Sequence, residues 1–385
     1  MEEWKEYRLG ELLNFRRGHD LPKTQMVEGN IPVAGSNGII GYHNEQTPVS
    51  PCITIGRSGN VGTPYIYDKC WAHNTVLYID DYKGNDPKFL YYFLKTLPLS
   101  SFGGGSAVPT LNRNHIHPMI VRFCKSLPTQ RKIASILSSL DDKIEVNRRI
   151  NEQLEELAQA LFKSWFVDFE PFKDEEFVDS ELGMIPKGWK VGELQDIGEV
   201  VGGATPSKAN QDYYTEKGIS WITPKDLSIN KNKFIDKGET DITELGYSKC
   251  SAKLMPKGSV LFSSRAPIGY IAIAKNELCT NQGFKSVVPK IAGTAFIYFY
   301  LRNNVSNIES MASGSTFKEA SGSLMKSLKV IVPPVELLHI FEDKVSALFD
   351  KQESLEQEIT HLTHLRDTLL PKLMSGEIDV NEVQI

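Results

Sequence analysis

The sequence predicts an α/β fold in which two mixed globular domains, related by duplication, are each followed by a long helix, and the two helices pair as a coiled coil. Two stretches carry apolar residues at alternating spacings of three and four, which is typical of helices with one narrow apolar face. The surrounding segments repeat at an almost constant offset, which indicates a duplicated architecture. A length of 385 residues suits two domains.

The first long helix is predicted from Pro128 to Trp165, with Thr129 available as a cap. At 1.5 Å per residue it is about 55 Å long. Because so narrow an apolar face cannot form a core alone, the helix needs a partner. The face consists of Ile133, Leu137, Leu140, Ile144, Leu154, Ala158, Leu161 and Trp165, with Asn147 and Asn151 in its middle.

The partner helix is predicted after Pro333 and Pro334, and its face starts at Phe341, 208 positions after Ile133. The two asparagines either fix the register of the pair at a cost in stability or face solvent, if the frame shifts. The alternative, two unrelated surface helices, is disfavoured by the constant offset. The second face consists of Phe341, Val345, Leu348, Leu355, Ile359, Leu362, Leu369 and Leu373, with Gln352 and Arg366 as polar interruptions.

Composition is that of an ordinary soluble globular protein, with 41% hydrophobic and 24% charged residues. We see no signal peptide or membrane-spanning run, and five scattered cysteines suggest reduced thiols in the cytoplasm. The net charge of −5 argues against nucleic acid, but residues 101–140 contain no acid and residues 245–306 contain only Glu277. Each half therefore has a basic region suited to a polyanion, unless its lysines only solvate loops.

Four pairs of segments carry the repeat, at offsets of 207 to 209 positions. One pair is a short aromatic helix, which is predicted to lie in a core rather than stack on bases because it is densely apolar. The pairs are residues 53–58 with 261–266, 73–75 with 280–282, 89–95 with 296–302, and 103–106 with 313–315. The predicted organisation is a globular domain over 1–126, a long helix over 127–168, an acidic and aromatic linker over 169–188, a globular domain over 189–332, a long helix over 333–374 and a tail over 375–385.

Catalytic motifs are weak or missing in the sequence. The run from Gly202 to Lys208 lacks the spacing of a phosphate loop. Residues 102–106 nearly match the glycine motif of methyl-donor-binding domains but end in Ser106. The Asp/Asn-Pro-Pro-aromatic motif for amino methylation of a base is missing, because the only Pro-Pro pair is flanked by valines. The pairs His115/His117 and His361/His364 lack an accompanying acid or cysteine cluster. We therefore expect no catalytic residue, no metal and no cofactor on this chain.

Binding chemistry fits the sequence better. Arginine donates two hydrogen bonds to guanine, asparagine and glutamine pair with adenine, and lysines and glycine-loop amides hold phosphates. Two similar domains joined by a stiff helical pair would read two short sites at a fixed separation. A turn-stabilising role is the alternative for each arginine. The DNA-binding candidates are Arg57, Ser58, Asn60, Asn112, Arg113, Arg265, Asn281, Gln282, Lys285 and Lys318.

Several segments resemble type I restriction–modification specificity subunits. Residues 127–134, 140–151 and 162–169 are similar to the central region of that family. Residues 261–269 with 280–284 are similar to its second recognition domain, and residues 370–378 to its C-terminal end. The resemblance covers nearly the whole chain.

The resemblance implies a non-catalytic subunit with two target-recognition domains, each reading one half of a split double-stranded DNA sequence. It also implies that the helices pack antiparallel, which gives a pseudo-twofold axis, and that they dock two methyltransferase subunits. Two restriction (translocase) subunits would join the full complex. Adenine methylation, ATP-dependent cleavage, S-adenosylmethionine, ATP and Mg would then belong to the partners.

With antiparallel helices, one chain imitates a symmetric dimer. Because the residues that follow the two arginines differ, we predict an asymmetric, non-palindromic target. Arg148 and Arg149 either contact the methyltransferase or solvate the helix. The rival hypotheses are a twin-domain protein scaffold that binds no nucleic acid and a self-contained nuclease or methyltransferase.

Overall fold

The computed structural model describes residues 4–103, 110–314 and 318–380. The chain divides into two compact units: a first unit of residues 1–146 and 360–385, and a second unit of residues 147–359. Both long helices contribute to both units. Of the glycine-rich segments singled out in the sequence, residues 104–106 and 315 lie outside the described residues.

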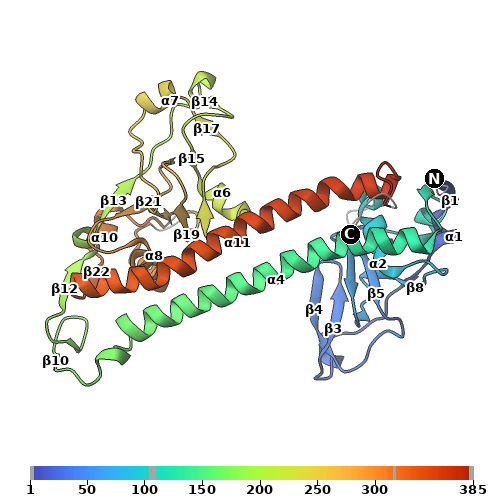
Figure 1. The fold of residues 1–385 in the computed structure, drawn as a ribbon, viewed down its shortest axis with the longest axis horizontal. Helices are drawn as coiled ribbons and strands as arrows, with labels where there is room; N and C mark the ends of the chain where they lie inside the picture. Colours follow the sequence, from blue (N-terminus) through green and yellow to red (C-terminus); the bar gives the residue numbers. More distant parts are fainter. Residues whose placement is uncertain (1–3, 104–109, 315–317, 381–385) are drawn as a thin grey trace. The chain divides into compact units, whose positions relative to one another are not determined.

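The first unit contains short strands in three sheets, with orders β2-β8-β5-β6, β4-β3-β7 and β1-β9 (Figure 1). Its strands are β1 (Lys5–Arg8), β2 (Asn14–Arg17), β3 (Ile31–Gly35), β4 (Gly38–His43), β5 (Cys52–Gly56), β6 (Pro64–Tyr67), β7 (Trp71–Ala72), β8 (Val76–Asp81) and β9 (Ile120–Phe123). Its short helices are α1 (Leu9–Leu12), η1 (Lys23–Gln25), α2 (Pro87–Lys95), η2 (Leu99–Phe102) and α3 (Arg113–Ile116).

The core of the first unit lies on one face of the β2-β8-β5-β6 sheet. Every residue of β5 is buried, as expected for a short, continuously apolar strand. Ile53 and Ile55 pack with the buried side chains of α2. That helix begins where the Asp86 carboxylate accepts the Phe89 N–H at 2.9 Å. The predicted core location of this aromatic helix is thus confirmed.

The second unit is built around a five-stranded sheet of order β13-β21-β18-β19-β16, with two-stranded pairs around it. Its strands are β10 (Phe177–Val178), β11 (Ile185–Pro186), β12 (Lys190–Glu193), β13 (Gly198–Gly202), β14 (Tyr214–Thr215), β15 (Trp221–Ile222), β16 (Phe234–Ile235), β17 (Asp241–Ile242), β18 (Val260–Ser264), β19 (Ile268–Ala274), β20 (Cys279–Thr280), β21 (Lys285–Pro289) and β22 (Lys329–Val332). Its short helices are η3 (Glu170–Phe172), α5 (Leu194–Ile197), η4 (Gln211–Tyr213), α6 (Pro224–Ile229), α7 (Glu244–Ser248), α8 (Thr294–Asn303), α9 (Val305–Met311) and α10 (Gly322–Lys326).

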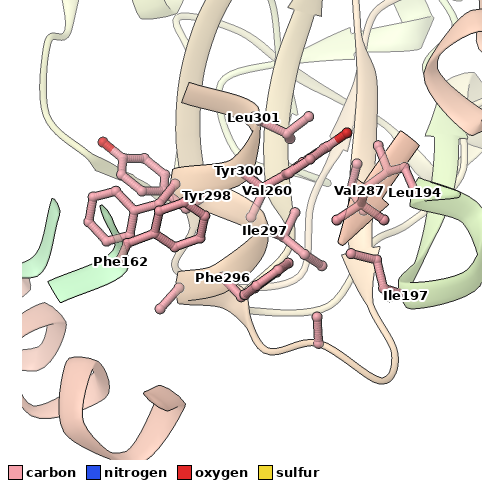
Figure 2. Packing of buried hydrophobic residues seen from close by; sticks show 14 of the residues in the cluster. Phe162, Leu194, Ile197, Val260, Val287, Phe296, Ile297, Tyr298, Tyr300 and Leu301 are labelled. Carbon is pink, nitrogen blue, oxygen red and sulfur yellow. The ribbon is translucent and has the colours of Figure 1, made fainter. Parts of the chain in front are cut away.

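Helix α8 lies at the centre of the second core. Figure 2 shows its side chains with Phe162 of α4 on one side and Val287, Leu194 and Ile197 on the other. Phe162 and Phe296 have ring centroids 5.5 Å apart. All residues from Ala295 to Leu301 are buried, so the second aromatic helix is also a core element, as predicted.

The two long helices are α4 (Leu127–Phe166) and α11 (Val335–Ser375). In the first unit, Arg366 donates to Asp141 at 2.7 Å. In the second unit, the Gln352 side chain donates to the backbone oxygen of Asn151 at 3.1 Å, and Phe341 packs against Phe166 with centroids 4.9 Å apart. Within the second unit, a later residue of α4 therefore contacts an earlier residue of α11, as in two helices that run in opposite directions.

All predicted face positions are buried or half-buried. The buried ones are Ile133, Leu137, Ile144, Asn147, Ala158, Phe341, Val345, Gln352, Leu355 and Leu373. The half-buried ones are Leu140, Asn151, Leu154, Leu161, Trp165, Leu348, Ile359, Leu362, Arg366 and Leu369. Neither asparagine faces solvent, so the frame-shifted alternative is wrong.

The linker after α4 folds back onto its own unit. Trp189 contacts the rings of Phe169 and Phe172 at centroid distances of 5.4 and 5.1 Å. Phe177 in turn packs on Phe169 at 6.0 Å. The surface that these aromatic residues need is supplied by the chain itself.

Candidate nucleic-acid interface

The first-unit candidates gather where β5 ends. The Arg57 N–H donates to the Thr75 oxygen at 2.8 Å, and the Leu111 N–H donates to the Arg57 oxygen at 2.7 Å. This places Arg57 between the start of β8 and the segment that leads into α3. Ser58 forms an isolated bridge with Thr110. Both side chains are half-buried.

The remaining first-unit candidates are exposed and support turns. The Asn60 side chain accepts from the Thr63 hydroxyl at 2.9 Å. The Asn112 side chain accepts from the Asn114 N–H at 2.9 Å and caps α3. The Arg113 guanidinium donates to the Phe15 oxygen at 3.2 Å, which leaves most of its donors open to a partner.

In the second unit, Glu319 joins two of the predicted cations. Its carboxylate lies 3.4 Å from the Arg265 guanidinium and 3.4 Å from the Lys285 ammonium. Lys318 is exposed, and its ammonium donates to the Glu309 backbone oxygen at 3.3 Å. Arg265 and Lys285 are therefore compensated within the fold, so a DNA contact has to compete with this carboxylate.

Asn281, Gln282 and Thr205 line a cavity of about 560 Å³ in the second unit. The Asn281 side chain accepts from the Gly283 N–H at 2.8 Å, and Gln282 accepts from the Thr205 hydroxyl. The other lining residues are Lys208, Gln211, Tyr214, Trp221, Thr223, Pro224, Lys225, Asp226, Glu239 and Thr240. The lining combines amides and lysines, which can bind base edges and phosphates, with the carboxylates of Asp226 and Glu239.

The same backbone hydrogen bonds occur in both units. In the second unit, the Ser264 N–H donates to the Gly283 oxygen, the Ala320 N–H donates to the Ser264 oxygen, and Arg265 forms a bridge with Glu319. Arg57 thus corresponds to Ser264, and Arg265 corresponds to Ser58. The sequence alignment of the two arginines is wrong by one residue, so Arg57 and Arg265 occupy successive rather than equivalent positions of the shared framework.

A second segment is shifted in the same way. The His73 N–H donates to the Ala34 oxygen, and the Asn281 N–H donates to the Ile222 oxygen. Strands β7 and β20 run parallel to β3 and β15 in matching registers. His73 therefore corresponds to Asn281 and Asn74 to Gln282, whereas the sequence alignment paired Asn74 with Asn281.

Residues 1–156 and 186–364 match the family model described as the type I restriction modification DNA specificity domain. The chain belongs to this family.

Three curated relatives carry the name of specificity subunits. The type I restriction enzyme MjaIX specificity subunit of Methanocaldococcus jannaschii is 40% identical over 192 residues, covering 47% of this chain and 44% of that protein. The HindI specificity subunit of Haemophilus influenzae is 29% identical, covering 65% and 67%. The EcoR124I/EcoR124II specificity subunit of Escherichia coli is 27% identical, covering 86% and 81%. The match thus spans less than half the length of the first of these relatives.

The fold is also that of a solved family member. The crystal structure of the type I restriction-modification S subunit from M. genitalium has a TM-score of 0.69 with this chain at 19% identity, covering 97% of this chain and 96% of that one. This likeness concerns the arrangement of the backbone. It agrees with mixed α/β domains and long helices in this specificity-domain chain.

Sequence reasoning missed two residues that contact the DNA-binding candidates. Arg17, at the end of β2, interacts electrostatically with Arg57, and Glu319 neutralises Arg265 and Lys285. The adjacent pair Arg16–Arg17 at the end of a strand-like run was a visible signal for the first. Nothing local in the sequence of this specificity-domain chain indicated the second, because Glu319 reaches its partners through tertiary pairing.

The histidine pairs singled out in the sequence of this specificity-domain chain lie in different surroundings. The His117 Nε2 atom accepts the Phe15 N–H at 3.1 Å, and His115, His361 and His364 are exposed. Across residues 4–103, 110–314 and 318–380, the structure contains no group of three or more His, Cys, Asp or Glu side chains arranged to hold a metal ion. Within the same ranges, no helix has the length and apolarity needed to cross a bilayer.

Proposed function

We propose that this chain is the DNA sequence-recognition subunit of a type I restriction–modification complex, and that each globular domain reads one half of a bipartite, asymmetric target. One observation carries the proposal beyond the family assignment. The two units share a backbone hydrogen-bonding framework, yet they place different side chains on it: Arg57 beside Arg17 in one, and Arg265 with Lys285 and Glu319 in the other. A shared scaffold with divergent side chains suits two readers of different base sequences.

We further propose that α4 and α11 pair as an antiparallel coiled coil that fixes the gap between the half-sites and docks two methyltransferase subunits. The contacts between Asn151 and Gln352, and between Phe166 and Phe341, support antiparallel pairing. Adenine methylation and ATP-dependent cleavage then belong to the partner methyltransferase and restriction subunits, together with S-adenosylmethionine, ATP and Mg.

Methylation mapping in the native host tests the proposal. Inactivating the gene for this chain should abolish methylation at one motif that consists of two different half-sites separated by a fixed gap. Restoring the gene on a plasmid should restore it. A motif that is a perfect palindrome, or methylation that persists without the chain, contradicts the proposal.

Substitution of Arg265 separates base reading from phosphate contact. If Arg265 reads a base, Arg265→Ala weakens binding to the mapped target by about 1–3 kcal/mol and leaves binding to unrelated duplexes nearly unchanged. Titration of the chain with target and scrambled duplexes measures the difference. Equal losses on both duplexes assign Arg265 to the phosphate backbone instead.

Retention on immobilised duplex DNA distinguishes the proposed DNA reader from the rival hypothesis, a protein scaffold that binds no nucleic acid. A DNA reader is eluted by rising salt, because phosphate contacts release counterions when they form. Absence of retention, both for the chain alone and for its complex with the methyltransferase subunits, favours the scaffold.

A further inference from the structure

A group of three arginines lies at one end of the main sheet of the first unit. Arg17 pairs with Leu77 across β2 and β8, and Ile55 pairs with Leu77 from the other side. Side chains alternate between faces along a strand. Arg17 therefore continues the core face occupied by Phe15, and Arg57 continues the face occupied by Ile53 and Ile55.

Arg113 completes the arginine cluster (Arg17, Arg57 and Arg113). Its guanidinium donates to the oxygen of Phe15, two residues before Arg17 on the same strand. The segment that leads to Arg113 is fixed to Arg57 by the hydrogen bond from the Leu111 N–H. The tertiary structure thus brings three arginines that are far apart in the sequence to the same end of the sheet, Arg57 beside Arg17 and Arg113 beside the strand that carries Arg17.

The arginine cluster has no carboxylate within ion-pair distance among the residues that the structure describes. The acid whose charge reaches nearby His117 is Asp80, and its carboxylate accepts from the Asn14 amide at 2.6 Å. Burial, and then the charge of Arg17, lowers the pKa of Arg57. Guanidinium groups nevertheless stay charged in proteins, so the fold holds like charges together without an internal anion.

We propose that the arginine cluster is a phosphate site that binds the DNA backbone at the half-site of the first domain. Arginine forks match the geometry of phosphate oxygens, and an anion between the side chains relieves their mutual repulsion. This inference rests on the proposed function and deepens it, because it gives Arg57 a positioning role and adds Arg17 to the interface.

The second unit provides an internal comparison. Strand register places Gly202 and Lys285 side by side there, as Arg17 and Leu77 are in the first unit. The cation of this pair is therefore on β2 in the first unit (Arg17) but on β21 in the second unit (Lys285), where Glu319 neutralises it. At this position of the shared framework the cation of the second domain is compensated, whereas that of the first domain is not.

The test measures how the affinity of the full-length chain for a labelled duplex changes with salt. Each phosphate contact contributes about −0.9 to the slope of log K against log salt concentration. Arg17→Gln and Arg57→Gln should each reduce the magnitude of the slope by about 1, equally on target and unrelated duplexes. Arg17→Lys and Arg57→Lys keep the charge and should retain most of the slope. Arg8→Gln, an exposed arginine on β1 outside the basic region of residues 101–140, is the matched control and should leave the slope unchanged.

The outcomes separate the inference from the proposed function. A wild-type chain without salt-dependent DNA binding overturns the proposed function itself. Normal wild-type binding with unchanged slopes for both glutamine variants overturns only the phosphate site. A loss confined to the target duplex reassigns the cluster to base reading. Thermal stabilisation by pyrophosphate that Arg17→Gln removes, with an unchanged DNA slope, indicates a site for free phosphate and also overturns the inference.

If a glutamine variant unfolds, the corresponding lysine variant tests the phosphate site instead. Arg17→Lys keeps a cation but loses the two-pronged geometry, so it should keep the slope and lose affinity by a few-fold. A lysine variant that is folded, as circular dichroism can verify, and that shows the shallower slope expected for Arg17→Gln contradicts a charge-based phosphate contact.

Discussion

Glu319 illustrates, at the scale of single residues, how one side chain changes the chemistry of a repeated framework. It bridges Arg265 and Lys285 in the second unit, whereas the corresponding residue of the first unit is the uncharged Thr110. Removing the Glu319 charge releases two cations without a large change in shape.

We predict that Glu319→Gln strengthens binding to unrelated DNA by roughly threefold to tenfold at low salt, because it removes repulsion of the phosphates and frees two donors. Fluorescence anisotropy with duplexes of unrelated sequence measures the effect. Glu309→Gln, an exposed position in the same unit, is the control. Weaker binding by Glu319→Gln would instead mean that the carboxylate holds Arg265 in its reading geometry.

His117 makes the first unit sensitive to acid. Its Nε2 atom accepts the Phe15 N–H at 3.1 Å and must be unprotonated to do so. Burial and then the charge of Arg113 lower its pKa below 6.5, opposed by Asp80. Between the folded and unfolded pKa values the unfolded chain binds more protons, so stability is present above pH 6.5 and is lost as pH falls toward the folded pKa.

His117→Ala should remove this part of the pH dependence and cost about 1 kcal/mol at neutral pH through the lost hydrogen bond. Thermal unfolding between pH 5 and 7.5, or hydrogen exchange at the Phe15 amide, measures both effects. The exposed His115→Ala variant should behave like wild type. An identical pH profile for His117→Ala and wild type would exclude this role.

At the scale of elements, the long helices combine an apolar face with a polar middle. Asn147 is 1% exposed, and neither polar atom of its side chain has a hydrogen-bond partner among the described residues. The Asn151 side chain, one turn later, hydrogen-bonds to Glu356, whose carboxylate also accepts the N–H groups of Lys233 and Phe234. The Asn151 Oδ1 atom is itself buried without a partner among the described residues, so the difference between the two asparagines is the hydrogen bond that Asn151 makes to Glu356.

We predict that Asn147→Leu stabilises the chain by about 1–2 kcal/mol, because a buried amide without a partner is replaced by an apolar side chain. Asn151→Leu should destabilise it by about 1–3 kcal/mol, since Glu356 loses a donor in a buried site. Equilibrium urea unfolding of the two variants gives a direct comparison. Destabilisation of equal size in both variants would show that Asn147 has a partner in solution, such as a bound water.

The helices were the most predictable elements, and the interface was the least. The three-and-four spacing from Ile133 to Trp165 depends only on local periodicity, and α4 runs from Leu127 to Phe166. The alignment of Arg57 with Arg265 failed because the backbone pairing, rather than residue identity, sets the correspondence. Glu319 and Arg17 were missed because their partners come from distant strands, which a single sequence cannot reveal.

At the scale of the whole molecule, the proposed function requires both globular domains and their helices to act on one duplex. Both helices pass from one unit to the other, α4 at residues 146–147 and α11 at residues 359–360. If the helical pair sets the gap between half-sites, its length is the quantity that evolution or an experiment can change without altering either reader.

Inserting seven residues into both helices at these positions should lengthen the helical pair by about 10 Å at 1.5 Å per residue. The preferred gap should then grow by about three base pairs at 3.4 Å each. Methylation should be weaker, because three base pairs turn one half-site by about 100° around the duplex. Methylation mapping with the altered chain measures the gap, and an unchanged gap would show that the helices do not set it.

The first unit draws its core from both ends of the chain, since Leu373, Met374 and Val380 pack with Leu9, Leu12 and Phe123. During translation, these late residues emerge from the ribosome only after the entire second unit has been made. The second unit can therefore fold first, while the nascent first unit keeps an apolar surface uncovered. A release of the chain before residue 360 would leave that surface to chaperones, to proteases or to a complementary fragment supplied in trans.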